Sequence, residues 1–144
     1  MRGNSQATVD EKGRVKVPAG FLAELRKFGP KFFVTSETGE FALIYPMKVW
    51  EGIEKKLAAL STHNRAKQKF LDRTNYFGQE VELDGQGRLL LPPVLREAAK
   101  LEGTVDVLGN PNALHVWNHA RFAEHLKRNE MTPDDDQVLD TLGI

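Results

Sequence analysis

The chain has 144 residues, of which 40% are hydrophobic and 28% are charged, which fits one compact domain or two small ones. It has no cysteine and no uninterrupted apolar stretch that could cross a bilayer, which excludes disulfides, thiol catalysis, thiolate metal sites and a transmembrane helix. The formal net charge is zero, but residues 130–144 hold five acids and no Lys or Arg, so that 20 basic and 15 acidic residues give residues 1–129 a charge of +5.

The first predicted element is a hairpin near the N-terminus. Residues 1–5 lack the apolar core of a signal peptide, so we expect a cytoplasmic protein, and residues 5–9 alternate as a strand does. A tight Asp-x-x-Gly loop occupies residues 10–13, and a second short strand ends at Pro18. A short helix is predicted next, with one apolar face formed by Phe21, Leu25 and Phe28.

A second hairpin and a longer helix follow. The predicted strands are residues 32–35 and 41–45, joined by a turn over residues 37–40. Pro46 suits the first turn of a helix, and an apolar stripe runs along that helix through Trp50, Ile53, Leu57 and Leu60.

A basic linker separates the two parts of the chain. Residues 65–73 are expected to form a helix in which Ala66 and Phe70 face inward. Four cations lie in this stretch, and they form either a solvated face or a supplementary phosphate contact: Arg65, Lys67, Lys69 and Arg73.

Beyond the linker the chain repeats itself at an offset of 74 residues. Residues 9–18 align with residues 83–92, with Asp, Gly, Arg and Pro at identical relative positions. The order strand-strand-helix-strand-strand-helix, run twice, predicts an α+β fold rather than a βαβ nucleotide-binding sheet. We therefore divide the chain into a first repeat with its helix, a basic helical linker, a second repeat with its helix and an acidic C-terminal tail: residues 1–62, 63–78, 79–129 and 130–144.

The repeated loop is the main candidate site. Each copy holds an Asp, a Gly and an Arg at the same spacing: Asp10, Gly13 and Arg14 in the first, Asp84, Gly87 and Arg88 in the second. We expect the glycines at positive φ and the aspartates to accept hydrogen bonds from backbone N–H groups of the turn. Each arginine is within reach of its aspartate, so an ion pair that only stabilises the turn is one interpretation.

Other features favour a nucleic-acid ligand. Lys12 lies at the loop tip, Lys16 follows Arg14 at an every-second-residue spacing, and Arg2 is nearby in sequence. A planar guanidinium can read a guanine edge with two hydrogen bonds or clamp a phosphate. The pattern also occurs twice, as a pseudo-twofold DNA-binding surface requires. The candidate DNA-binding residues are Arg14, Arg88, Lys12, Lys16, Arg2 and Gln86.

These motifs resemble those of the MraZ family of bacterial regulators. The resemblance covers residues 1–128 and includes Arg2-Gly3-Asn4, both loops, and Leu43-Ile44-Tyr45-Pro46 followed by Trp50. It implies two tandem AbrB-like swapped-hairpin β-barrel halves related by pseudo-twofold symmetry, with flanking helices, in a ring-shaped homo-oligomer. It also implies a nucleoid-associated protein that binds G-rich direct repeats in double-stranded DNA and represses the division and cell-wall gene cluster, including its own operon.

The two loops differ in their neighbours. Lys12 becomes Gln86, and Val15-Lys16-Val17 alternates whereas Leu89-Leu90-Leu91 is apolar throughout. This pattern predicts that residues 89–91 are buried on both faces, in the core or in a subunit contact. We therefore expect the first loop to supply most of the DNA affinity, and Arg14→Ala to lose more binding than Arg88→Ala.

No set of residues suggests an enzyme, a metal site, a cofactor or a small-molecule substrate. His115 and His119 are four residues apart, but His115 belongs to a predicted strand and no zincin-type carboxylate lies between them. Glu80, Glu82 and Asp84 share a strand face without a nucleophile or base partner.

The acidic tail has the pattern of a short helix. Thr132 can cap it, Pro133 suits its first turn, and its apolar residues share one side: Val138, Leu139 and Leu142. We hypothesise that the tail docks on the basic face and lowers DNA affinity, so that truncation after Asn129 tightens binding. The alternatives to a regulator are an antitoxin-like AbrB-fold module whose main partner is another protein, and a scaffold that uses the barrel only for assembly.

Overall fold

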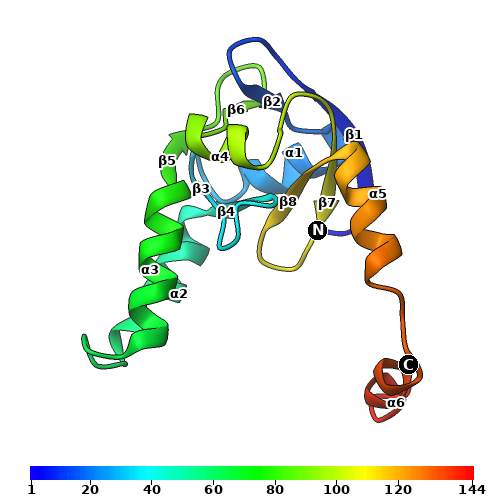
Figure 1. The fold of residues 1–144 in the computed structure, drawn as a ribbon. Helices are drawn as coiled ribbons and strands as arrows, with labels where there is room; N and C mark the ends of the chain where they lie inside the picture. Colours follow the sequence, from blue (N-terminus) through cyan, green and yellow to red (C-terminus); the bar gives the residue numbers. More distant parts are fainter.

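The computed structural model describes residues 1–144 as eight strands and six helices (Figure 1). The first part of the chain forms β1 (Asn4–Val9), β2 (Arg14–Lys16), α1 (Ala19–Arg26), β3 (Lys31–Thr35), β4 (Ala42–Pro46) and α2 (Met47–Ala58). Helix α3 (Arg65–Phe77) connects it to β5 (Gln79–Glu82), β6 (Arg88–Leu90), α4 (Pro93–Ala98), β7 (Gly103–Gly109), β8 (Leu114–Asn118) and α5 (His119–Arg128), and α6 (Pro133–Asp140) ends the chain. The α+β class and the predicted order of elements are confirmed.

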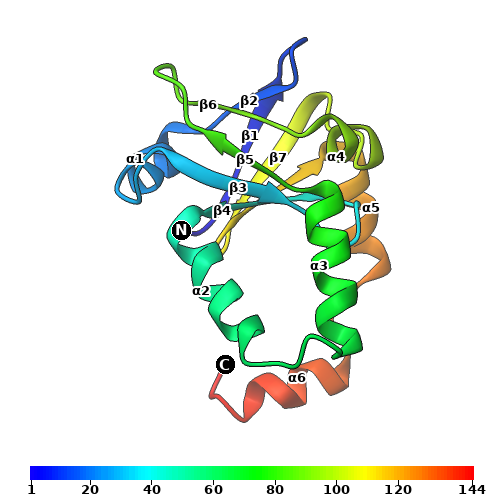
Figure 2. The same ribbon diagram turned by 90° about the vertical axis from the view of Figure 1, so that its left-hand side faces the viewer.

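All eight strands belong to one antiparallel sheet that curves into a nearly closed barrel (Figure 2). The strand order is β5-β3-β4-β8-β7-β1-β2-β6, and strands from the two parts of the chain pair with each other at four places: β1 with β7, β3 with β5, β2 with β6 and β4 with β8. Two further backbone hydrogen bonds, from Val17 N–H to Gly87 O and from Leu91 N–H to Gly13 O, join each loop to the other part. Neither part therefore completes its sheet alone.

The core lies inside this barrel and on the helices that close it. Alternate strand positions point inward, and they bring together side chains from both parts, among them Phe32, Val34, Leu89 and Leu114. Leu25 of α1 and Leu95 of α4 are also fully buried. The molecule therefore has one shared hydrophobic core.

Within one chain, β6 is not buried on both faces. Leu89 and Leu91 are buried, but Leu90 is 40% exposed. The register places Leu90 opposite Arg14 and Leu89 opposite Val15. Because the pleat sends successive side chains to opposite faces, Leu90 faces outward even though its neighbours fill the core.

Three helical predictions are wrong in detail. Helix α1 ends at Arg26 and leaves Phe28 exposed, because Gly29 adopts a φ of +100° and Pro30 follows it. Ala66 is exposed at the first turn of α3, whereas Phe70 is half-buried and stacks on Trp50 with ring centroids 6.0 Å apart. Leu60 is exposed because α2 already ends at Ala58.

Four helices, α2, α3, α5 and α6, extend toward the end of the molecule opposite the two Asp-x-x-Gly loops, whereas α1 and α4 pack on the barrel (Figure 1). Helices α2 and α3 descend on one flank, and α5 and α6 descend on the other (Figure 1). No helix of the structure is both long enough and apolar enough to span a membrane.

Candidate nucleic-acid interface

The first loop is a tight turn organised by one aspartate. One carboxylate oxygen of Asp10, Oδ1, accepts hydrogen bonds from the backbone N–H groups of Lys12 and Arg14 at 3.0 and 2.9 Å. The other, Oδ2, accepts one from Nε of Arg14 at 2.8 Å. Gly13 adopts a φ of +82°, which a glycine reaches without steric cost.

The second loop reproduces this geometry. Oδ1 of Asp84 accepts hydrogen bonds from the backbone N–H groups of Gln86 and Arg88 at 2.8 and 2.9 Å, and Oδ2 accepts one from Nε of Arg88 at 2.9 Å. Gly87 adopts a φ of +77°. The two copies therefore share an identical set of hydrogen bonds.

The aspartate occupies only one edge of each guanidinium group. Both hydrogen bonds use Nε, and the terminal Nη nitrogens of Arg14 and Arg88 make no hydrogen bond in the structure. The side chains are 28% and 26% exposed, respectively. An arginine fixed on one edge and open on the other can present two parallel donors to a base edge or a phosphate. The ion pair and a ligand contact are thus compatible.

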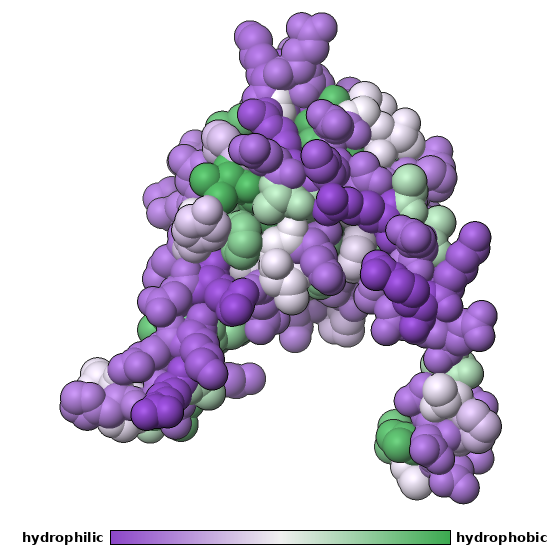
Figure 3. All heavy atoms as spheres, viewed as in Figure 1, coloured by the Kyte–Doolittle hydropathy of each residue, from purple (hydrophilic) through white to green (hydrophobic).

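Register places the outward side chains of β2 and β6 on one face. Lys16 lies directly opposite Arg88, and Arg14 lies opposite Leu90. Diagonal neighbours across such a pair are about 7–8 Å apart, which brings Arg14 and Arg88 close together. The exposed residues Lys12 and Gln86 occupy the two loop tips, and two hydrophilic projections stand above the barrel in Figure 3.

Arg2 is not part of this face. Strand β1 runs for six residues between Arg2 and the first loop, a separation of roughly 20 Å at the rise of an extended strand. The backbone of Arg2 packs instead against Gly109 at the far end of β7. Proximity in sequence was misleading because the intervening residues are fully extended.

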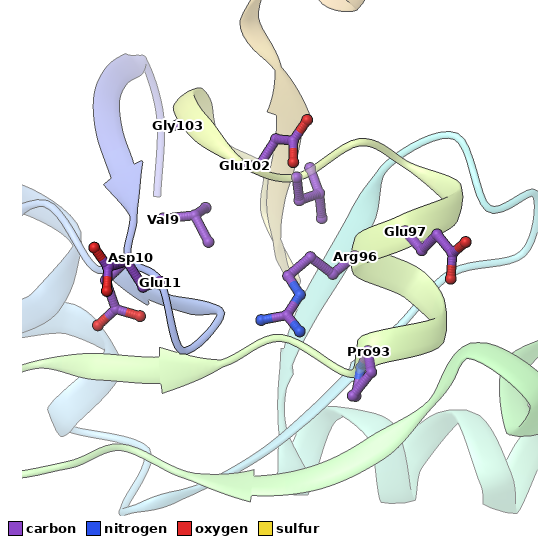
Figure 4. Close-up of a pocket in the computed structure, with 9 residues that line it drawn as sticks. Val9, Asp10, Glu11, Pro93, Arg96, Glu97, Glu102 and Gly103 are labelled. Carbon is purple, nitrogen blue, oxygen red and sulfur yellow. The ribbon is translucent and has the colours of Figure 1, made fainter.

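Sequence reasoning missed a residue beneath the first loop. Arg96, on α4, lays its guanidinium directly against Gly13, so that a Cβ at this position would displace the Arg96 side chain. It lines a pocket of about 590 Å³ together with Asp10, Glu11 and Glu102, among others (Figure 4). Leu22 takes the corresponding place against Gly87, and it is the residue that the 74-residue offset pairs with Arg96. Extending the repeat alignment would have shown this difference.

We expect alanine at Gly13 to destabilise the protein, whereas alanine at Gly85 should not. The positive φ of Gly13 costs an L-residue about 1–2 kcal/mol, and the added Cβ also displaces Arg96. Gly85 lies in the second loop with open space around it and no positive φ, so alanine there is neutral or stabilises by about 0.4–1 kcal/mol. Urea unfolding measures both, and equal effects would contradict the role of Gly13.

The hydrogen bonds within the loops lower the pKa of both aspartates. The largest cause is the hydrogen bond from the backbone N–H of Arg14 for Asp10, and from that of Arg88 for Asp84. The guanidinium group of the same arginine lowers each pKa further.

A depressed folded-state pKa gives stability that is complete above the ordinary value of 3.8 and is lost as the pH falls through the folded value. We expect urea unfolding to show this loss, and an Asp10→Asn/Asp84→Asn variant to show a weaker dependence on pH below 4. An identical acid profile for that variant would contradict the expectation.

The remaining candidates do not form a site. His115 is half-buried beside Phe41, and burial lowers its pKa. His119 points elsewhere, with Nδ1 2.8 Å from Oδ2 of the buried Asp106. Glu80 and Glu82 are exposed on β5, and no group of three potential metal ligands occurs.

The acidic tail does not lie on the basic face. Helix α6 is at the end of the molecule opposite the loops, beyond α5 (Figure 1), and none of its residues is buried. The hypothesis that it covers the basic face of its own chain is therefore wrong. Hydrogen bonds of Asn118 and Arg121 to the C-terminal end of α4, and of His119 to Asp106 of β7, fix the start of α5, which directs the tail away from β2 and β6.

Comparison with known proteins identifies a family that this chain resembles. A family model described as "MraZ protein, putative antitoxin-like" matches residues 1–73 and 78–141. A transcriptional regulator MraZ of Acidobacterium capsulatum is 49% identical, over 100% of this chain and 99% of that protein. Those of Koribacter versatilis and Moorella thermoacetica are 49% and 38% identical, over 100% and 95% of this chain and 99% and 92% of the relatives.

Proposed function

This chain belongs to the MraZ family, and from that premise we propose that it is a sequence-specific DNA-binding transcriptional regulator. Full-length relatives bear the name transcriptional regulator, which supports a DNA ligand. The observation that carries the proposal is the pair of guanidinium groups, each held by its aspartate at Nε and open at Nη, on one outward face with Lys16. In this proposal the protein binds DNA and catalyses no reaction.

The proposed interface consists of the β2–β6 face and the two loop tips. It includes Arg14, Arg88, Lys12, Lys16 and Gln86 and leaves out Arg2. We assign base reading to the arginines, because their forked donors match a guanine edge, and phosphate contacts to the lysines. In this assignment the aspartates and glycines of the loops hold the arginines in place.

The finer proposals concern architecture and target. The pairing of each part's strands with those of the other supports two interleaved swapped-hairpin halves within the four proposed segments. We assign to the protein the repression of the division and cell-wall gene cluster, including its own operon, through G-rich direct repeats. It acts in the cytoplasm at the nucleoid as a ring-shaped homo-oligomer. The resemblance to the family is the support for these assignments.

An oligomer explains how a weakly basic chain binds DNA tightly. With a charge of only +5 on residues 1–129, one copy makes few phosphate contacts. Several linked copies on several direct repeats raise the apparent affinity by about 10²–10⁴-fold without a new contact.

Gel-shift titration of the protein's own upstream region tests this function. We expect a duplex with several repeats to bind far more tightly than one with a single repeat, and binding to weaken steeply with salt, by about 0.9 in log K per log unit of salt for each phosphate contacted. A duplex with scrambled repeats is the control. Equal affinity for the scrambled duplex would overturn sequence-specific regulation.

An antitoxin-like function, with another protein as the main partner, is the second candidate. The description of the matching family model favours it, as does an exposed α6 with apolar side chains. It predicts that the chain does not prefer the repeats over the scrambled duplex, so the same titration separates the two functions.

A further inference from the structure

We propose that the C-terminal arm, residues 130–144, docks on α3 of a second copy of this chain and joins copies head to tail. This inference rests on the proposed function only in that it supplies a contact for the proposed oligomer. It assigns a role to two surfaces that the DNA interface does not use, one on each flank of the molecule.

The arm contains a well-formed helix without a partner. Thr132 and Asp135 form a complete capping box, and Pro133 occupies the first turn, so the sequence specifies α6 strongly. Nevertheless, the helix has only eight residues and none is buried. Isolated helices of this length are marginal in water, so a surface that covers α6 would stabilise it.

One face of the arm combines apolar and acidic side chains. At helical spacing, Asp134, Asp135, Val138 and Leu142 fall on the same side, with the acids toward the N-terminal end. Val138 is 66% exposed, and Leu142 is also exposed. Asp136 and Asp140 fall on the opposite side.

A groove of complementary character lies on α3. It has a volume of about 470 Å³ and is lined by Lys69, Asp72, Arg73, Tyr76 and Phe77, of which the first four recur at helical spacing on one face. Tyr76 is 67% exposed, although its ring packs edge-on against Phe77 at 4.9 Å. The cations lie toward the N-terminal end of α3 and the aromatic rings toward its C-terminal end.

The two surfaces match when α6 and α3 run parallel. Asp134 and Asp135 then lie near Lys69 and Arg73, and the apolar side chains of the arm meet Tyr76 and Phe77. The charges of the larger segments agree, because residues 47–77 hold seven Lys or Arg against three Asp or Glu, whereas the arm holds five acids and no Lys or Arg. The opposite charges of the two segments favour association of the copies, and burial of apolar area stabilises the contact once it has formed.

A second copy is the occupant because the two surfaces lie on opposite flanks. Helix α3 descends on one side of the barrel and α5 carries the arm down the other (Figure 1). Only residues 129–132 separate α5 from α6, which limits that link to about 14 Å. A contact between two different surfaces is heterologous, and such contacts form a ring when the rotation between successive copies closes. Because the loops stand at the other end of the molecule, every copy keeps its DNA face free.

Disulfide trapping tests this contact, since the chain has no cysteine of its own. We expect the full-length Tyr76→Cys/Val138→Cys variant, oxidised without DNA, to give a ladder of covalent multimers on a non-reducing gel. Both positions are exposed, so the core is untouched. Each single-cysteine variant is a control and can give at most a covalent dimer. A disulfide within one chain, or none, would overturn the proposal.

Charge reversal provides an independent test of the same contact. Adding Lys69→Glu/Arg73→Glu to the double-cysteine variant should remove the ladder. Adding Lys55→Glu/Lys56→Glu, the same change in charge on the exposed side of α2, should preserve it. Circular dichroism verifies that each variant is folded. A ladder that survives the groove reversal would overturn the proposal, and because no DNA is present, that result is independent of whether the protein binds DNA.

Discussion

The Arg14→Ala/Arg88→Ala variant is expected to lose sequence-specific DNA binding while keeping its fold. Each bidentate arginine–guanine contact contributes about 1–3 kcal/mol, so removal of both should weaken binding by roughly 30-fold to 10⁴-fold for each copy engaged. Both side chains lie on the outer face of β2 and β6, and neither belongs to the hydrophobic core. Gel-shift titration against the upstream repeats measures the loss.

The matched control is Lys127→Ala/Arg128→Ala, which removes two positive charges from the exposed end of α5. It should retain sequence-specific binding. Comparable losses for the two double variants would show that net charge, and not the oriented guanidinium groups, sets the affinity.

The single variants should differ less than the unequal loops suggest. Leu90 is exposed rather than buried, and Lys16 lies across from Arg88, so the structure leaves two differences between the loops. Lys12 at the first tip corresponds to Gln86 at the second, and Arg96 lies against Gly13 where Leu22 lies against Gly87. We expect Arg14→Ala to weaken DNA binding somewhat more than Arg88→Ala does. The difference in affinity between the two variants should be smaller than the loss that either shows relative to the unmodified chain. A larger loss at Arg88 would contradict a dominant first loop.

Leu89→Ala is expected to destabilise the protein by about 2–5 kcal/mol, the range for a fully buried leucine. Leu89 pairs with Val15 where strands from the two parts of the chain meet, so the cavity opens in the shared core directly beneath the DNA face. Urea unfolding at a fixed protein concentration measures the effect, because the proposed assembly would make stability depend on concentration.

Leu90→Ala on the same strand is the control, with an expected change within about 0.5 kcal/mol. The pair tests the alternation of β6 directly. If both substitutions cost the same, Leu90 is buried in the assembled protein, and the outward face of β6 is not available to DNA.

The loops were predictable from sequence because their interactions are local. An aspartate, a glycine three residues later and an arginine after it form a turn in which every hydrogen bond of the aspartate side chain lies within five residues, so the motif carries its own geometry. The duplication at an offset of 74 residues likewise predicted the order of elements, since each repeat has the same pattern of apolar and turn residues.

The tertiary structure decided what depends on partners distant in sequence. Leu90 reads as a core residue beside two buried leucines, and only its pairing with Arg14 shows that it faces outward. Arg2 seemed close to the first loop until an extended β1 separated them, and Arg96 reached Gly13 because β2 and β6 are paired. Turn geometry and helix caps are set by a few neighbouring residues, whereas the face on which a strand side chain lies depends on register. A segment without alternation, such as Leu89-Leu90-Leu91, does not specify that register by itself.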